Sequence, residues 1–377
     1  MKIAFVYDLV HPYTIGGGER RIFELSRRLA RRHEVHCVSL ALWGRPLRRV
    51  SEEGVIFHGV PPPPGPMYDR DGRRRLLEPI WFGAGLAAVP VLRDCDVVDC
   101  TSFPFFSVLA ARAQAALGRG RLFVTWLEYW GGYWNQYQPG VAMIGRRLET
   151  LALRASPRII AISEHTRQGI LKSPVAPQHV DVLPCGVDLA TFRDGPAAAG
   201  GPDIIFVGRL IPEKGASLLL DALARPALRG ASLLVVGEGS ERERLQQQGE
   251  ELNLGSRLRF ESRLEDATLR TLIKGARVLA LPSMREGFGM VVLEAMASGT
   301  PVVVCRGPNS AAAELVTDGE TGLVVSRDTD ELAEALSSIV RDPDRRRRLG
   351  NAALEAAKPF DWDRLAERLE AIFESAR

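Results

Sequence analysis

The chain has 377 residues, a length that fits two domains better than a single hydrophobic core. It is 46% hydrophobic and 25% charged, with no apolar run near the roughly 20 residues of a membrane span and with five scattered cysteines, none in C-x-x-C spacing. The net charge of +3 is uneven, because residues 1–190 hold 24 basic and 17 acidic side chains and the remainder 25 and 29. We therefore expect no disulfide framework, zinc site or nucleic-acid partner, and an anionic partner for the first half.

The first half alternates short apolar runs with amphipathic segments, which predicts an α/β chain with parallel strands. Residues 20–32 place Ile22, Leu25 and Leu29 on one helical stripe, with arginines opposite. The apolar run at residues 2–7 is short for a signal peptide and is followed by polar residues, so it predicts a first strand and a cytoplasmic protein. Strands are predicted at 2–7, 34–40, 54–59, 96–100, 121–126, 158–163 and 179–184.

The small, flexible residues of DGPAAAGG, 194–201, interrupt this pattern and predict an interdomain linker. The alternation then restarts, which predicts a second doubly wound domain. In such sheets, ligands bind beyond the carboxyl ends of the strands, so the loops there are the candidate sites. The second set of strands is predicted at 203–208, 231–237, 257–262, 277–282, 300–305 and 322–326.

The loop after the first strand of each half has features of a phosphate site. Gly16, Gly17 and Gly18 directly precede a helix, where backbone N–H groups can approach a phosphate; a plain turn between strand and helix is the alternative. In the second half, VGRLIPEKG brings Arg209 and Lys214 to a strand end, where two cations suit a diphosphate and a solvated loop is the alternative.

Two glutamates stand eight residues apart in SMREGFGMVVLEAMASG. Glu286 lies in the loop after a predicted buried strand, and Glu294 about one turn into the next helix, so both can face one site. Carboxylates accept pairs of hydrogen bonds from vicinal hydroxyls, as in a sugar or ribose. The amides of Phe288, Gly289 and Met290 at the helix start suit anionic or hydroxyl oxygens.

Together these stretches resemble the retaining glycosyltransferases of family 4, also called glycosyltransferase group 1. The resemblance rests on the E-x7-E pattern of Glu286 and Glu294 inside ALPSMREGFGMVVLEAMASGTPVVV. It extends in the same order over GGGE, ISEHT, LPCGVDLATF, GRLIPEKG and FDWDRLAERL, and so covers essentially the full chain.

The resemblance implies an α/β fold of the GT-B type, with two Rossmann-like doubly wound domains facing across a cleft. Residues 1–193 would form the acceptor-side domain, 194–201 the linker and 202–358 the domain for the nucleotide-sugar donor. Residues 359–377 would form a helix that crosses back to the N-terminal domain.

The resemblance also implies roles. Arg209 and Lys214 would bind the donor diphosphate and stabilise the leaving nucleotide without a metal, and no cofactor is expected beside a UDP- or GDP-linked donor. Glu294 would hold the ribose hydroxyls and Glu286 the transferred sugar. From the other domain, Gly16 and Gly17 would close on the diphosphate.

One departure from the family pattern concerns VTWLEYWGGYW, 124–134, where relatives carry a histidine and this chain has Leu127. Glu128 is the nearest polar candidate for that histidine's work. A leucine there predicts either a deoxygenated donor sugar or no transfer. The aromatic residues of this stretch predict a sugar-stacking site, with packing at a domain edge as the alternative; they are Trp126, Tyr129, Trp130, Tyr133 and Trp134.

The sequence leaves several partners open. The acceptor is expected to be a lipid-linked glycan or a small molecule, and the basic first half is compatible with peripheral contact at the inner face of a membrane. Two further hypotheses are a non-catalytic nucleotide-sugar-binding relative and a GT-B sugar-nucleotide epimerase. The E-x7-E pattern argues against the epimerase.

Overall fold

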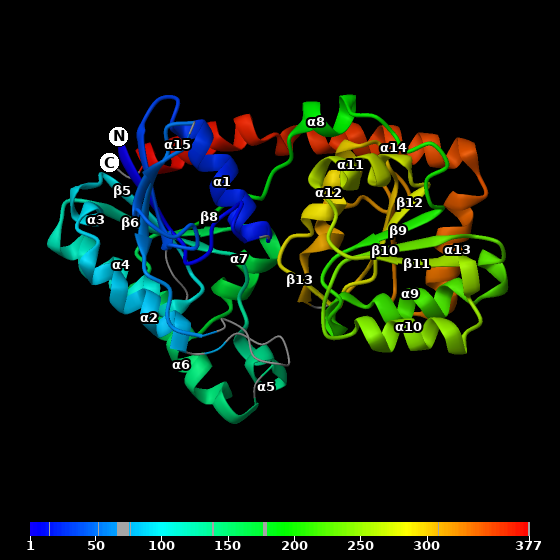
Figure 1. The fold of residues 1–377 in the computed structure, drawn as a ribbon, viewed down its shortest axis with the longest axis horizontal. Coiled ribbons are helices and arrows are strands. Elements are labelled where there is room, and N and C mark those ends of the chain that lie inside the picture. Colours follow the sequence, from blue (N-terminus) through cyan, green and yellow to red (C-terminus); the bar gives the residue numbers. More distant parts are fainter. Residues whose placement is uncertain are drawn as a thin grey trace. The chain divides into compact units, whose positions relative to one another are not determined.

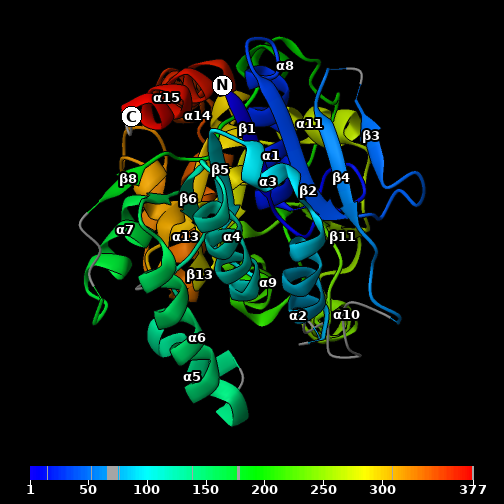
Figure 2. The same ribbon diagram turned by 90° about the vertical axis from the view of Figure 1, so that its left-hand side faces the viewer.

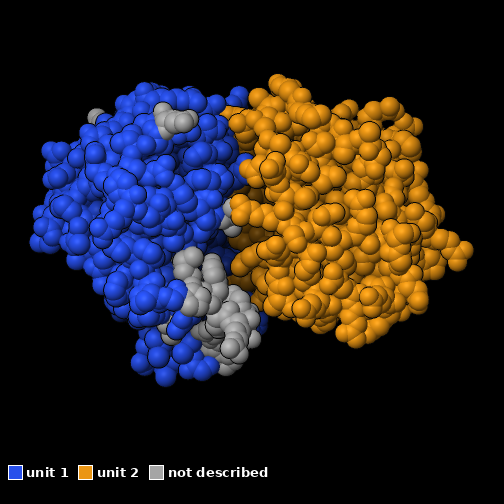
Figure 3. Space-filling model, viewed as in Figure 1, with its two compact units in different colours: residues 1–185, 362–377 blue, residues 186–361 orange. Residues whose placement is uncertain are grey.

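The computed structural model describes residues 1–14, 16–51, 53–65, 75, 77–137, 139–175, 179–307 and 309–375. It divides into two compact units (Figure 3). Unit 1 comprises Met1–Cys185 and Trp362–Arg377, and unit 2 comprises Gly186–Asp361. Each unit is built on one main sheet with helices on both faces (Figure 1).

The sheet of unit 1 has eight strands in the order β3-β4-β2-β1-β5-β6-β7-β8. All neighbours are parallel except β3 and β4. Seven strands coincide with the predicted runs; β3 was missed because its residues are all exposed and form no apolar run. The strands are β1 (Lys2–Val6), β2 (Glu34–Leu40), β3 (Arg48–Val50), β4 (Ile56–Val60), β5 (Val97–Thr101), β6 (Arg121–Trp126), β7 (Ile159–Ala161) and β8 (Val180–Val182).

Two helix layers cover this sheet. In one, α1 (Gly17–Leu29) packs against α15 (Trp362–Ser375), joined by ion pairs from Arg28 to Asp363 at 2.8 Å and from Arg32 to Glu370 at 2.6 Å. The other layer holds α2 (Leu77–Gly85), α4 (Phe105–Leu117) and α6 (Ala142–Ala155), where α4 contacts both neighbours (Figures 1 and 2). Shorter helices are α3 (Val91–Asp94), α5 (Trp134–Tyr137) and α7 (Glu164–Leu171).

The sheet of unit 2 has six parallel strands in the order β11-β10-β9-β12-β14-β16. Its central strands are almost wholly buried, as in parallel sheets covered on both faces. These strands are β9 (Ile204–Val207), β10 (Leu233–Val236), β11 (Leu258–Glu261), β12 (Val278–Leu281), β14 (Val302–Cys305) and β16 (Leu323–Val325), with β13 (Arg285–Glu286) and β15 (Asn309–Ser310) as a separate pair. The helices are α8 (Leu189–Asp194), α9 (Ala216–Leu223), α10 (Arg242–Glu251), α11 (Asp266–Gly275), α12 (Met290–Ala297), α13 (Thr329–Val340) and α14 (Pro343–Ala357).

The boundary between the units precedes the segment predicted as a linker. Residues 194–201 lie inside unit 2, where they pack on α11. The amide of Ala198 donates to the Thr271 carbonyl at 3.0 Å, and the Lys274 ammonium donates to the Gly195 carbonyl at 2.7 Å. Small residues there allow close approach to α11, and the first crossing of the chain between units falls at Cys185 and Gly186.

Each sheet has one point where the strand order reverses, because the second strand pairs on one side of the first and a later strand on the other. In unit 1 this point lies between β1 and β5, and in unit 2 between β9 and β12. Ligands of open α/β sheets bind at the carboxyl ends of the strands at such points. Within the described residues, no helix is long and apolar enough to cross a membrane.

Candidate active site

The loops after β9 and β12 are bound to each other at the reversal point of unit 2. The Met284 amide donates to the Glu213 carbonyl at 2.8 Å. Arg327, which follows β16, donates from its guanidinium to the Pro282 carbonyl. Gly215 is the N-cap of α9 with φ of 71°, and a Cβ there would lie 2.3 Å from the Pro282 oxygen. Only glycine fits this crossing, so the two loops form one preformed edge.

Lys214 and Glu286 meet at this edge. The Lys214 Nζ lies 2.5 Å from Glu286 Oε2, and each side chain is 15% exposed. The Ser283 hydroxyl donates to the same carboxylate oxygen at 3.5 Å. The backbone of Glu286 is positioned by the pairing of β13 with β15, in which Glu286 lies opposite Ser310. A cation and a carboxylate predicted from stretches 72 residues apart are thus in direct contact.

The second glutamate lies on α12, which follows directly. Gly289 caps this helix in the left-handed conformation, with φ of 95°, and Met290 is the first helical residue. Phe288 is buried and its ring centroid lies 6.3 Å from that of Phe360. Glu294 is half-buried one turn into the helix. The structure therefore brings Lys214, Glu286 and the amino end of α12 together at the edge of one sheet.

Arg209 is exposed directly after β9. Beside it, the G-x-G of the loop after β10 has a structural purpose, because a Cβ at Gly237 would lie 1.9 Å from the Gly208 carbonyl oxygen. Backbone bonds fasten the two loops, with the Leu210 amide donating to the Glu238 carbonyl at 2.8 Å. This packing makes the loop a tight turn between β10 and α10.

In unit 1 the three glycines form the amino end of α1. Gly16 is its N-cap in extended conformation, and Gly17 is the first helical residue. Gly18 has a packing reason, because a Cβ there would lie 2.9 Å from Leu127 Cδ1 and 3.3 Å from the Tyr7 ring. Leu127, which follows β6, therefore lies against the amino end of α1, beside the reversal point of this sheet.

The aromatic stretch after β6 divides into buried and half-buried rings. Trp126 and Trp134 belong to the core, at 0% and 7% exposure. Trp130 is half-buried and stacks on Phe103, which follows β5, with centroids 5.6 Å apart and planes 18° apart. Tyr129 and Tyr133 are also half-buried. Packing accounts for the two core tryptophans, and Trp130 also contacts Tyr133 and Trp134, with ring centroids 5.6 Å and 4.7 Å apart.

A glutamate that sequence analysis missed holds this stretch in place. Glu149 of α6 is 2% exposed, and its carboxylate accepts from the backbone amides of Trp130 at 2.8 Å and Gly131 at 2.9 Å. The predicted Glu128 lies beside it, accepting from the Trp130 indole N–H at 3.0 Å. Burial and the Glu149 charge raise the pKa of Tyr129. The signal was available, because Glu149 stands in the otherwise apolar stripe of α6.

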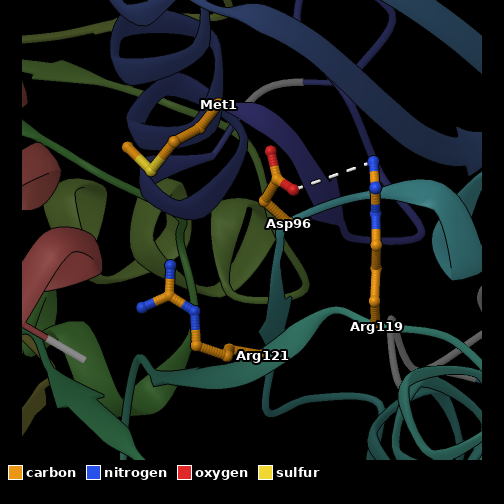
Figure 4. Close-up of a pocket in the computed structure, with 4 residues that line it drawn as sticks. All are labelled: Met1, Asp96, Arg119 and Arg121. Carbon is orange, nitrogen blue, oxygen red and sulfur yellow. Dashed lines mark ion pairs between the residues drawn. The ribbon is translucent and has the colours of Figure 1, made fainter. Parts of the chain in front are cut away.

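The cysteines and a polar pocket lie apart from these edges. All five cysteines are buried thiols outside any disulfide, and burial raises the pKa of Cys37 and of Cys95 to about 12. A pocket of about 370 Å³ lies at the amino ends of strands in unit 1 (Figure 4). Its side chains are engaged in the fold, since Arg121 donates to the Phe373 carbonyl at 2.7 Å. It is lined by Met1, Asp96, Arg119 and Arg121.

Comparison with protein families matches almost the whole chain. Residues 15–191 match the model described as glycosyltransferase family 4, and residues 190–356 match the model described as glycosyl transferases group 1. The chain belongs to the glycosyltransferases of this family. The two models meet at residues 190 and 191, close to the boundary between the units.

Individual proteins agree with this assignment. The D-inositol 3-phosphate glycosyltransferase of Kribbella flavida is 32% identical over 261 residues, which are 63% of this chain and 60% of that protein. The matches cover 48% to 60% of the length of the first three such relatives.

Solved structures show the same fold. Sucrose-phosphate synthase from Thermosynechococcus elongatus has a TM-score of 0.85 at 22% identity, covering 100% of this chain and 98% of that one. Anabaena HepE in complex with UDP-glucose has a TM-score of 0.78 at 20% identity, with both chains fully covered. The predicted GT-B class, with two Rossmann-like parallel-sheet domains, is confirmed.

Proposed function

We propose that the protein transfers a sugar from a nucleoside diphosphate sugar to an acceptor hydroxyl, with retention of the anomeric configuration and without a metal. Family membership supports the transfer, and the paired charges at the reversal point of unit 2 support the donor. The observation that carries the proposal is the contact between Lys214 and Glu286 at the carboxyl edge, beside the amino end of α12. The comparisons favour neither the epimerase nor the non-catalytic alternative.

The cations supply the chemistry that leaving-group departure requires. When the bond between sugar and diphosphate breaks, negative charge develops on the leaving phosphate. Lys214, fixed by its ion pair, and Arg209, exposed after β9, offset that charge. A preformed cation contributes more than a mobile one because it needs no reorganisation during the reaction.

The two glutamates bind different parts of the donor. Glu294, on α12, accepts hydrogen bonds from the ribose hydroxyls. Glu286, in contact with the Lys214 ammonium that faces the diphosphate, accepts from the transferred sugar. The amides of Phe288, Gly289 and Met290 at the start of α12 receive oxygens of the donor.

Calorimetric titration of UDP and GDP in excess chelator tests the donor assignment. One nucleotide should bind with chelator present, and Arg209→Ala should weaken that binding several-fold. Arg341→Ala, which removes an exposed arginine elsewhere in unit 2, is the matched control and should leave binding unchanged. Binding that disappears with chelator would contradict the metal-free proposal.

For unit 1, we propose that Gly16, Gly17 and Glu128 bind the donor, with Leu127 facing an apolar carbon of a deoxygenated donor sugar. A leucine neither donates nor accepts a hydrogen bond, so a sugar hydroxyl against it would lose its partner. Leu127→His should therefore slow transfer from the native donor. Faster transfer of an ordinary hexose by the wild type than of its deoxy analogue would contradict this assignment.

The acceptor is a hydroxyl compound, either a lipid-linked glycan or a small molecule. The excess of basic residues in the first half supports an anionic acceptor or surface. Assays with paired neutral and phosphorylated acceptors would show whether the acceptor is anionic.

A further inference from the structure

The outer surface of one helix layer in unit 1 gathers most of the large exposed apolar side chains. The layer consists of α2, α4 and α6, and Figure 2 shows these helices on one side of the sheet. Seven of the eleven large hydrophobic residues exposed among the described residues lie on these three helices. They are Leu77, Ile80, Trp81, Leu117, Met143, Ile144 and Leu151.

On α6 these residues form a surface rather than scattered points. Met143 is 59% exposed, Ile144 57% and Leu151 45%, and Ile144 and Leu151 stand seven residues apart, on one helical face. Leu148 is half-buried between them. An apolar stripe of this kind in a protein of ordinary composition marks a contact surface.

The charge on the same layer has one sign. The helices expose four arginines, namely Arg112, Arg146, Arg147 and Arg154. Their two acidic residues, Glu78 of α2 and Glu149 of α6, are each 2% exposed and so are withdrawn from the surface. Among the described residues, none of these arginines has an ion-pair partner.

The opposite layer of the same sheet is different. There α15 carries exposed acids; Asp363 pairs with Arg28 of α1, and Glu370 pairs with Arg32, which follows α1. Because both layers cover one sheet, the unbalanced charge is a property of the α2-α4-α6 surface and not of unit 1 as a whole.

We propose that the α2-α4-α6 surface docks on an anionic lipid bilayer. Apolar side chains enter the headgroup region while arginines contact lipid phosphates, as in helices that lie in the interface plane. Trp81, whose indole N–H donates to the Pro61 carbonyl at 2.8 Å, has the amphipathic ring that favours this depth. A second copy of the chain fits less well, because a symmetric contact would set the arginines against each other.

Docking would also reach the candidate site. On its inner face, α6 binds the Trp130 and Gly131 amides through Glu149. Its outer face would contact the bilayer. A lipid-linked acceptor would then be delivered beside the stretch that carries Glu128. The docking itself does not rest on the proposed transfer activity.

Vesicle flotation tests the proposal without an activity assay. The wild-type chain should float with phosphatidylcholine vesicles that contain phosphatidylglycerol, not with pure phosphatidylcholine, and less at high salt. Arg147→Glu with Arg154→Glu should lower binding about tenfold or more, and Ile144→Gln with Leu151→Gln should also lower it. Thermal unfolding verifies that each variant is folded.

The matched control is Arg341→Glu with Arg348→Glu, which makes the same charge change on exposed positions of unit 2 and should float like the wild type. Three outcomes would overturn the proposal: no flotation, equal loss in the control, or a concentration-dependent dimer that the Ile144→Gln, Leu151→Gln variant abolishes. Nucleotide titration is independent of all three, so failure of docking leaves the donor assignment standing.

Discussion

The carboxyl edges of the two sheets are stabilised in different ways. In unit 2, a lysine and a glutamate from separate loops pair at 2.5 Å, so the charges themselves fix the site. In unit 1, the buried Glu149 carboxylate binds two backbone amides, and half-buried aromatic rings cover the edge. The first edge suits a charged ligand and the second a sugar ring with its hydroxyls. The predictions below test this contrast.

Removing the cation of unit 2 should have the largest effect. Lys214→Ala should lower kcat/KM for transfer about 100-fold to 1000-fold, because it removes preorganised charge from the leaving group. Steady-state kinetics with varied donor measures it. Lys358→Ala is the control, since Lys358 also pairs with a glutamate but is 53% exposed in unit 2. Equal kcat/KM values in the two variants would contradict the proposal that Lys214 stabilises the leaving group.

Removing the anchor of unit 1 should affect stability first. Glu149→Ala leaves two partly buried backbone amides without their acceptor and should lower the free energy of unfolding by about 1 kcal/mol. Urea unfolding, monitored by hydrogen exchange of the amides of unit 1, measures this change in the free energy of unfolding. Glu149→Gln should recover part of the lost stability. The control Glu164→Gln, which changes an exposed residue of α7, should leave the free energy of unfolding unchanged. Nucleotide affinity should not change, which separates this edge from that of unit 2.

The two glutamates of unit 2 should differ in which step they affect. Glu294→Ala should weaken nucleotide binding by about 1 to 3 kcal/mol, because two ribose hydroxyls lose a charged acceptor. Glu286→Gln should leave nucleotide affinity nearly unchanged and reduce turnover. Calorimetry and kinetics on the same preparations decide it. The reverse pattern would mean that the two roles are exchanged.

The smallest expected effect concerns pH. All six histidines lie in unit 1, and burial, with the charges of His36, Arg48 and Lys2, lowers the pKa of His58 to about 4. Glu34 accepts from His36, which bonds to His58 at 2.9 Å.

Above pH ~6.5, His58 is neutral in both the folded and the unfolded chain. Below this pH the unfolded chain binds the proton first, so the folded protein loses stability between pH ~6.5 and about 4. Hydrogen exchange at pH 7.5 and pH 5 should show weaker protection in unit 1 only at the lower value. His58→Gln should reduce that difference. Equal weakening of unit 2, which contains no histidine, would show that these groups are not the cause.

The sequence predicted the strands well because buried parallel strands are continuous apolar runs between loops. The strands β3, β13 and β15 were missed because each is two or three residues long and is held by a neighbour rather than by its own apolar pattern. The E-x7-E pattern located Glu286, but its pairing with Lys214 needed the loops after β9 and β12 to be placed together.

Glu149 is a residue whose burial could be predicted from the sequence but whose hydrogen-bond partners could not. Its position matches the buried stripe of α6, with Gly145 and Ala152, and an acid in such a stripe signals a buried acceptor. What it accepts from could not be predicted, because the amides of Trp130 and Gly131 belong to an irregular turn without periodic pattern.

The return of the chain to unit 1 has a consequence for biosynthesis. The helix α15 supplies fully buried Leu365, Leu369 and Phe373, yet the ribosome delivers it only after the whole of unit 2. Unit 2 is continuous and can fold as it emerges, as domains generally do during synthesis. Unit 1, although most of it precedes unit 2 in the chain, keeps the part of its sheet that α15 covers exposed until α15 is synthesised, and so is completed second.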